Sequence, residues 1–156
     1  MSKLTHFDGD GRPRMVDVSG KAPTERVAIA RGFIALPEDL LARIAAGTIA
    51  KGNPIAIAEL AGIMGAKRTA DLIPLCHPIA LDAVTVAIRP APGGLSVESE
   101  ARTSARTGVE MEAMTAVSVA CLTLYDMLKS AARDIVIERI ELIEKRGGKS
   151  GAWTRG

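Results

Sequence analysis

The longest helical pattern in the chain begins Thr107-Gly108-Val109-Glu110-Met111-Glu112 and runs on to Tyr125-Asp126-Met127-Leu128-Lys129. Its first residues include Thr107 and Glu110, which match the S/T-x-x-E capping box that opens many helices. Between these two ends most residues are Val, Ala, Leu, Met, Cys or Thr. The sequence therefore predicts a long helix that is packed on most of its circumference and needs other elements to cover it.

Two ionisable residues near the end of this helix are candidates for chemistry. Asp126 and Lys129 lie three positions apart, which places them about 60° apart on the same helical face. A buried carboxylate without a partner is strongly disfavoured, so Asp126 must be paired, hydrogen-bonded or protonated. Two interpretations stay open on this pattern: a structural ion pair, or an acid–base pair that serves catalysis.

The segments on either side of the helix predict the order β-α-α-β-β-α-β. Alternation and turn residues predict strands at 26–36, 83–88, 95–101 and 135–143, with helices from Pro37 to Gly47 and from Asn53 towards Arg68. An α+β fold with a ferredoxin-like antiparallel sheet and helices packed on one face is the economical arrangement. We predict a single domain over 1–156, with 1–25 and 146–156 as flexible arms.

The composition argues against a nucleic-acid-binding protein. The 156 residues are 47% hydrophobic and 24% charged, which is ordinary for a globular domain. The net charge of +2 and the pI near 8.7 are too mild to indicate a nucleic-acid surface. Aromatic residues make up 3% of the chain, which leaves few platforms on which bases could stack.

The cysteines and the N-terminus predict a cytoplasmic protein. Cys76 and Cys121 lie in apolar surroundings without paired spacing, as expected for reduced thiols. The first residues, 1–6, lack the apolar core of a signal peptide. We also expect no membrane span, because no apolar run approaches the length that crosses a bilayer.

Two short motifs resemble known binding sites but do not meet the requirements of those sites. The stretch Gly147-Gly148-Lys149-Ser150 is not a P-loop, because Ile143 stands where the motif requires glycine and no helix can follow. A flexible basic loop that closes over an anion remains open. The stretch Leu75-Cys76-His77-Pro78 is not a zinc site, since the chain has two Cys and two His and zinc needs three or four ligands.

Basic residues recur at the ends of the predicted elements. Lys51 precedes a helix start, where backbone N–H groups already favour an anion. Lys67 and Arg68 lead directly into the loop 74–78, where they add positive charge. Together these positions indicate a site for a polyphosphate more than a nucleic-acid surface.

Five motifs, in order along nearly the whole chain, resemble the MoaC family of cyclic pyranopterin monophosphate synthases, which act in molybdenum-cofactor biosynthesis. These motifs are Met15-Val16-Asp17-Val18-Ser19, Ala66-Lys67-Arg68-Thr69 with Leu72-Ile73-Pro74-Leu75-Cys76-His77-Pro78, Thr107-Gly108-Val109-Glu110-Met111-Glu112-Ala113, Tyr125-Asp126-Met127 with Lys129, and Gly147-Gly148-Lys149-Ser150-Gly151. The resemblance implies a ferredoxin-like subunit in a homohexamer, a trimer of dimers, with the active site at a subunit interface. It also implies conversion of 3′,8-cyclo-7,8-dihydro-GTP to cyclic pyranopterin monophosphate with release of pyrophosphate.

The resemblance further implies which residues form the site. The catalytic residues would be Asp126, Lys129 and Lys51, and the substrate-binding residues would be Leu75, Cys76, His77, Met111, Glu112, Lys21, Arg26, Lys67, Arg68 and Lys149. We expect Lys51 on the wall of the interface opposite Asp126. No metal ligand and no cofactor is implied, although a divalent ion accompanying the triphosphate stays open. A ferredoxin-like module that binds a small anion without chemistry is the alternative.

Overall fold

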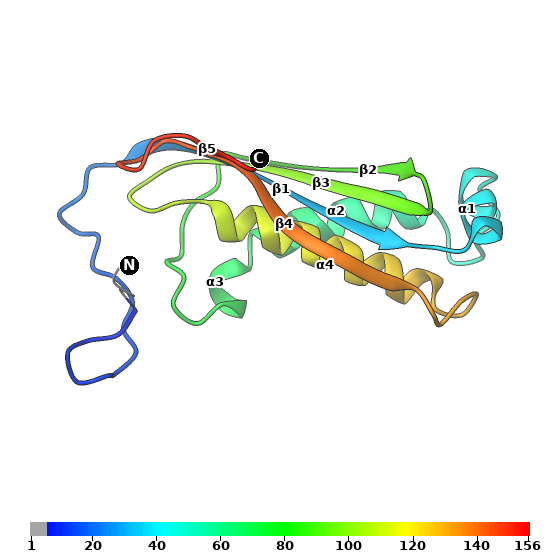
Figure 1. Ribbon diagram of the computed structural model, residues 1–156, viewed down its shortest axis with the longest axis horizontal. Coiled ribbons are helices and arrows are strands. Elements are labelled where there is room, and N and C mark those ends of the chain that lie inside the picture. Colours follow the sequence, from blue (N-terminus) through cyan, green and yellow to red (C-terminus); the bar gives the residue numbers. More distant parts are fainter. Residues whose placement is uncertain (1–5) are drawn as a thin grey trace.

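The computed structural model describes residues 6–156, and within that range the chain forms one sheet with helices on one face (Figure 1). The elements are β1 (Thr24–Ala35), α1 (Glu38–Ala45), α2 (Pro54–Ala66), α3 (Thr69–Leu72), β2 (Ala83–Ala91), β3 (Gly94–Ala105), α4 (Glu110–Leu128), β4 (Val136–Arg146) and β5 (Trp153–Thr154). The sheet order is β2-β3-β1-β4-β5, and every pair of neighbours is antiparallel. The predicted ferredoxin-like α+β fold is confirmed.

The central strand β1 separates a packed face of the sheet from an open one. Ala28, Ala30 and Ile34 alternate along β1 and are fully or almost fully buried beneath the helices. Arg31, on the opposite face, is exposed and pairs with Glu98 of β3. The helices α2 and α4 therefore cover only one face of the sheet.

Helix α4 is the core helix that the sequence predicted. Val117, Cys121 and Leu124 are fully buried in its middle, against the sheet. Our expectation that no apolar run could reach membrane length was wrong, because α4 is long and apolar enough by length and composition. Half of the relevant stretch is buried inside the fold, so α4 packs as a core helix and not as a membrane span.

The predicted capping box at the start of α4 was wrong. The helix begins at Glu110 with Val109 at the N-cap position, and no side chain caps it. The Glu110 carboxylate lies over Gly108, where a Cβ atom would overlap it. Thr107 lies outside the helix and lines a cavity instead.

The second predicted helix is two helices. Helix α2 starts as predicted, with the Asn53 side chain accepting a hydrogen bond from the amide of Ala56 at 3.2 Å. It ends at Ala66, and the short α3 follows after Lys67 and Arg68. This break turns the following loop, 73–82, towards the start of α4.

The two arms differ from each other. Residues 6–23 form no strand or helix apart from an isolated bridge between Phe7 and Pro13, and they lie beyond the sheet at one end of the subunit (Figure 1). Residues 1–5 lie outside the described residues. The C-terminal arm folds back, because Trp153 of β5 pairs with Lys145 of β4.

Gly62 and Gly65 of α2 let this helix approach α4 closely, because a Cβ atom at either position would meet atoms of α4. We expect Gly62→Val to lower the free energy of unfolding by about 3 kcal/mol. A Cβ atom at Gly62 would lie 2.9 Å from the Ala116 carbonyl oxygen, a backbone atom that cannot move aside. Urea denaturation should show the loss. Gly9→Val is the matched control, since a Cβ atom there meets nothing within 4 Å; equal stability of the two variants would contradict this packing.

Candidate active site

The three predicted catalytic residues lie together at the C-terminal end of α4. The Lys129 ammonium donates to the Asp126 carboxylate, with Nζ 2.6 Å from Oδ1. Lys51, from the loop between α1 and α2, donates to the backbone carbonyl of Asp126 at 3.1 Å. The expectation that Lys51 lies on the wall opposite Asp126 was therefore wrong.

This group of three, the acid–base cluster, stands on the subunit surface. The Asp126 side chain is 67% exposed and that of Lys129 is 52% exposed, so the predicted apolar surroundings of Asp126 were also wrong. The hydrogen bond and the charge of Lys129 lower the pKa of Asp126, and the same hydrogen bond raises the pKa of Lys129. In a free subunit the pair is thus a carboxylate and an ammonium in water, which is weakly stabilising.

A second group of predicted residues lines a cavity of about 250 Å³ near the N-terminal end of α4. We call it the ring cavity, and its lining includes Leu75, Cys76, His77, Met111, Glu112 and Lys21. His77 Nε2 lies 2.6 Å from the carbonyl oxygen of Val16, so the loop after α3 holds the N-terminal arm against the cavity. The structure therefore brings together all five residues of the predicted contact set, together with one predicted lysine.

A larger cavity of about 820 Å³ adjoins the ring cavity and is strongly basic. This cation cavity shares Lys21, Thr107 and Gly108 with its neighbour. Its charged lining consists of Lys21, Arg26, Arg106 and Lys149, with no acidic residue among them. Arg26 is fixed there by a hydrogen bond from Nε to the carbonyl oxygen of Ala105 at 3.0 Å. Such a cavity suits a polyphosphate.

The sequence analysis did not assign Arg106 to the site. Arg106 directly follows β3 and precedes Thr107 and Gly108, which line both cavities. Its position among recurring cations at element ends was the available signal, but many such cations are only solvated. What distinguishes Arg106 is its place directly after β3, where it lines the cation cavity beside Thr107 and Gly108.

Two predicted cations lie elsewhere. Lys67 lines a separate cavity of about 340 Å³ between α3 and the loop that follows it, and it does not line the ring cavity. Arg68 is the N-cap residue of α3 and lines neither the ring cavity nor the cation cavity. Lys67 shares its cavity with one other predicted contact, Glu112, whereas Arg68 shares neither of the two cavities described above.

Glu112 is the most strongly perturbed carboxyl group near the site. The residue is 4% exposed, and burial raises the pKa of its side chain to about 7. The neighbouring charge of Glu110 acts in the same direction. Burial, with the charge of Glu112, also raises the pKa of the Cys76 thiol. Cys76 is thus a protonated neighbour at neutral pH, and Glu112 can exchange protons there.

The acid–base cluster and the ring cavity are far apart within one subunit. Asp126 follows Glu112 by fourteen residues of the same continuous helix. At a rise of 1.5 Å per residue this amounts to about 21 Å along the axis of α4. A ligand held beside Glu112 therefore cannot touch Asp126 of the same chain.

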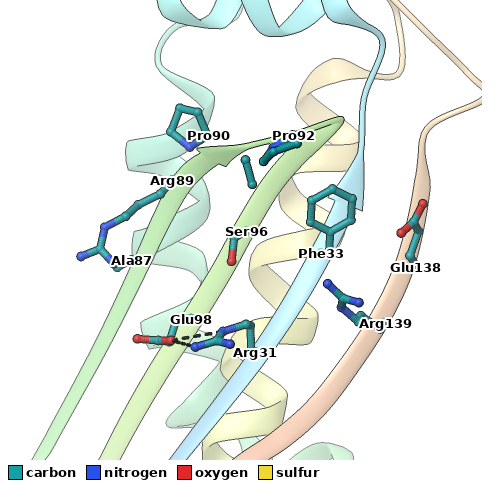
Figure 2. A pocket seen from close by; sticks show the side chains of 11 residues that line it. Arg31, Phe33, Ala87, Arg89, Pro90, Pro92, Ser96, Glu98, Glu138 and Arg139 are labelled. Atoms are coloured by element: carbon teal, nitrogen blue, oxygen red, sulfur yellow. Dashed lines mark hydrogen bonds and ion pairs between the residues drawn. The ribbon is translucent and has the colours of Figure 1, made fainter.

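The open face of the sheet carries another hollow, of about 650 Å³, which includes none of the predicted site residues (Figure 2). Arg31 pairs with Glu98 at 2.7 Å on its floor, and the Arg139 guanidinium lies 5.7 Å from the centre of the Phe33 ring. These charges largely satisfy one another, as on a solvated sheet face. Among residues 6–156, no cluster of three or more His, Cys, Asp or Glu side chains is placed to hold a metal ion.

Comparison with known proteins identifies the family. The sequence pattern of the MoaC family matches residues 15–148, which include every predicted site residue except Lys149. The chain belongs to the MoaC family. MoaC proteins similar to it include the cyclic pyranopterin monophosphate synthase of Novosphingobium aromaticivorans, which is 56% identical over 153 residues and 98% of each chain.

Two further MoaC relatives are similar over nearly their whole length. The cyclic pyranopterin monophosphate synthase of Thermomicrobium roseum is 55% identical over 157 residues, which cover 99% of this chain and 95% of the relative. That of Heliobacterium modesticaldum is 52% identical over 157 residues and 99% of each chain. Both the acid–base cluster and the ring cavity thus fall within the region that this MoaC chain shares with its relatives.

Proposed function

We propose that this MoaC protein is a cyclic pyranopterin monophosphate synthase of molybdenum-cofactor biosynthesis. It converts 3′,8-cyclo-7,8-dihydro-GTP to cyclic pyranopterin monophosphate and releases pyrophosphate. The names of relatives that are 52–56% identical over nearly the full chain support the activity. The observation in the fold that carries the proposal is the ring cavity opening onto an all-basic cavity, because such a pair matches a purine-derived ring that bears a triphosphate.

The cation cavity performs the phosphate part of the reaction. The leaving pyrophosphate gains negative charge as its bond to the α-phosphate breaks, and positioned cations stabilise that charge. Arg26 and Arg106 come from the paired ends of β1 and β3, whereas Lys21 and Lys149 come from the two arms. The first pair is thus set by the sheet, and the second pair is carried by segments that can adjust to the ligand.

The acid–base cluster performs proton transfers on the ring. Opening and reclosing a purine-derived ring requires a group that accepts protons and one that donates them, both in reach of the same atoms. Asp126 supplies a carboxylate that accepts a hydrogen bond from the Lys129 ammonium, and the Lys51 ammonium donates to the backbone carbonyl oxygen of the same residue. Substrate or a neighbouring subunit would exclude water from these exposed groups and move their pKa values towards neutrality.

The site is formed by two subunits, because the ring cavity and the acid–base cluster of one chain lie at opposite ends of α4. Large apolar side chains are exposed on the outer surface of the helical layer: Ile57, Leu60 and Met64 on α2, and Met111 and Leu122 on α4. A two-fold axis across this surface sets the two copies of α4 antiparallel and brings Asp126 of one chain towards the ring cavity of the other. Burial of the apolar residues stabilises this pairing.

The family resemblance supports the larger assembly, and the unpaired cysteines and the polar first residues support the location. We place this dimer in a homohexamer, a trimer of dimers, in the cytoplasm. No redox change occurs in the proposed reaction, so it needs no resident cofactor. Turnover with and without a chelator tests whether a divalent ion accompanies the triphosphate.

The direct test of the function is incubation of the purified protein with the cyclic GTP derivative. Pyrophosphate and the pterin product should appear in equal amounts and at the same rate. A module that only binds anions would bind the compound and release neither product. That result would overturn the proposal.

The loop 147–150 is expected to close on the phosphate chain. Gly147 and Gly148 have φ angles of 93° and 74°, and the Arg26 guanidinium lies directly against Gly148. Adding inorganic tripolyphosphate should slow amide exchange in this loop, and added salt should weaken the effect. Amides of the loop 8–11, remote from the cation cavity, serve as the control. Unchanged exchange at saturating tripolyphosphate would remove Lys149 from the site.

A further inference from the structure

Glu112 separates two cavities. The ring cavity and the 340 Å³ cavity that contains Lys67 have one lining residue in common, and it is Glu112. The loop after α3 forms the rest of the partition: Leu75, Cys76 and His77 line the ring cavity, whereas 78–80 line the other side. We call the second one the rear cavity, since it lies behind this loop as seen from the substrate.

The carboxyl group of Glu112 has an unusual environment for so buried a residue. Its own backbone amide donates a hydrogen bond to it, and no side chain among residues 6–156 does so, although the residue is 4% exposed. A buried carboxylate normally requires such partners. Here the two cavities are the remaining places from which its oxygens can be solvated. The carboxyl group therefore lies between the rear cavity on one side and the ring cavity on the other.

We propose that Glu112 passes protons between water in the rear cavity and the substrate in the ring cavity. This role rests on the proposed function and extends it, because it adds a third proton-transfer group to the reaction. In the forward step, the O–H bond of the neutral carboxyl breaks and the proton forms an N–H or O–H bond on the substrate. The resulting carboxylate is then reprotonated by a hydronium ion or buffer acid of the bulk solvent, with water in the rear cavity carrying the proton, which restores the starting state. Removal of a proton from the substrate follows the same route in reverse.

The charges around Glu112 fit this role. The other titratable side chains that line the rear cavity are Lys67 and Asp71, and those that line the ring cavity are His6, Lys21, Cys76, His77 and Glu110. Burial raises the pKa of Glu112 to about 7, so the protonated and ionised forms are similarly populated at neutral pH.

Two substitutions test the relay. Glu112→Gln preserves the shape of the side chain but cannot release a proton, so kcat should fall about a hundredfold with little change in KM. The limb of the pH–rate profile near pH 7 should disappear as well. Ala70→Leu fills the rear cavity without touching the substrate side, and kcat should fall about tenfold with KM unchanged. Ala46→Leu, at an exposed position remote from both cavities, is the matched control.

A measurement on the unmutated protein tests the proton relay independently of the proposed enzyme activity. Carbon-13 NMR of the Glu112 carboxyl in the free protein should show a titration midpoint near pH 7. A midpoint below about 5, in the ordinary range of a solvated carboxyl, would overturn the relay whatever the enzyme does. An increase in KM alone in Glu112→Gln would likewise make the residue a binding contact and no more. Failure of the wild-type protein to release pyrophosphate would instead count against the proposed function.

Discussion

Asp126→Asn is expected to lower turnover by about three orders of magnitude while the protein stays folded and assembled. Asparagine has nearly the same volume, so the change removes an ionisable group and leaves the end of α4 otherwise intact. Because Asp126 is largely exposed and its pairing with Lys129 is screened by water, the fold depends little on the ion pair. Single-turnover kinetics with the cyclic GTP derivative, together with sizing of the variant, would measure both quantities.

Lys129→Met provides the companion measurement. If the two residues act as one unit, this variant should lose about as much activity as Asp126→Asn, and the double variant should lose little more. Near-normal turnover in Asp126→Asn, with assembly confirmed, would reduce the pair to a structural one. A thermal unfolding transition shared by all variants would exclude loss of fold as the cause.

Mixed assemblies of two inactive variants are expected to recover activity when the two defects lie at opposite ends of the subunit. The first variant is Asp126→Asn, and the second combines Lys21→Met with Lys149→Met in the cation cavity. In a mixed pair, one site receives an intact acid–base cluster from one chain and an intact cation cavity from the other. Random pairing at equal amounts makes half the dimers mixed, each with one working site of two, so about one quarter of wild-type activity should return.

The control pair uses two defects at the same end. Lys51→Ala and Asp126→Asn both damage the acid–base cluster, since the Lys51 ammonium lies 3.1 Å from the carbonyl oxygen of Asp126. In a mixed pair of these two variants, every site contains a damaged acid–base cluster. Activity should therefore stay at background. Recovery in this control, or none in the first mixture, would contradict a site shared between subunits.

Local patterns were sufficient to predict most of the fold. Proline and asparagine at helix starts, alternation in the strands and a turn at Gly93, with φ of 79°, gave the element order and the layering. The strands are longer than predicted, because ladder hydrogen bonds continue into turn-rich residues such as Pro90 at the edge of the sheet. The family motifs gave the contact set of the ring cavity, which the loop after α3 brings together.

What the sequence could not show is distance and burial. The apolar pattern of α4 suggested a buried Asp126, but that residue falls on the outward side near the helix end, where 67% of its side chain is exposed. Glu112 was expected only as a contact, because its pKa depends on tertiary burial that no local pattern encodes. The same is true of the separation between the two ends of α4, which determines how many chains a site needs.

The return of the C-terminal arm onto the sheet affects how readily an anion is captured. The loop 147–151 is held at one end by β4 and at the other by the pairing of Trp153 with Lys145, and the Lys145 ammonium donates to the Ser150 hydroxyl across it. A segment fixed at both ends has far fewer conformations to lose than a frayed terminus. Part of the entropic cost of wrapping a phosphate chain is therefore met when the subunit folds, and ligand binding has only the remaining motion of the loop to arrest.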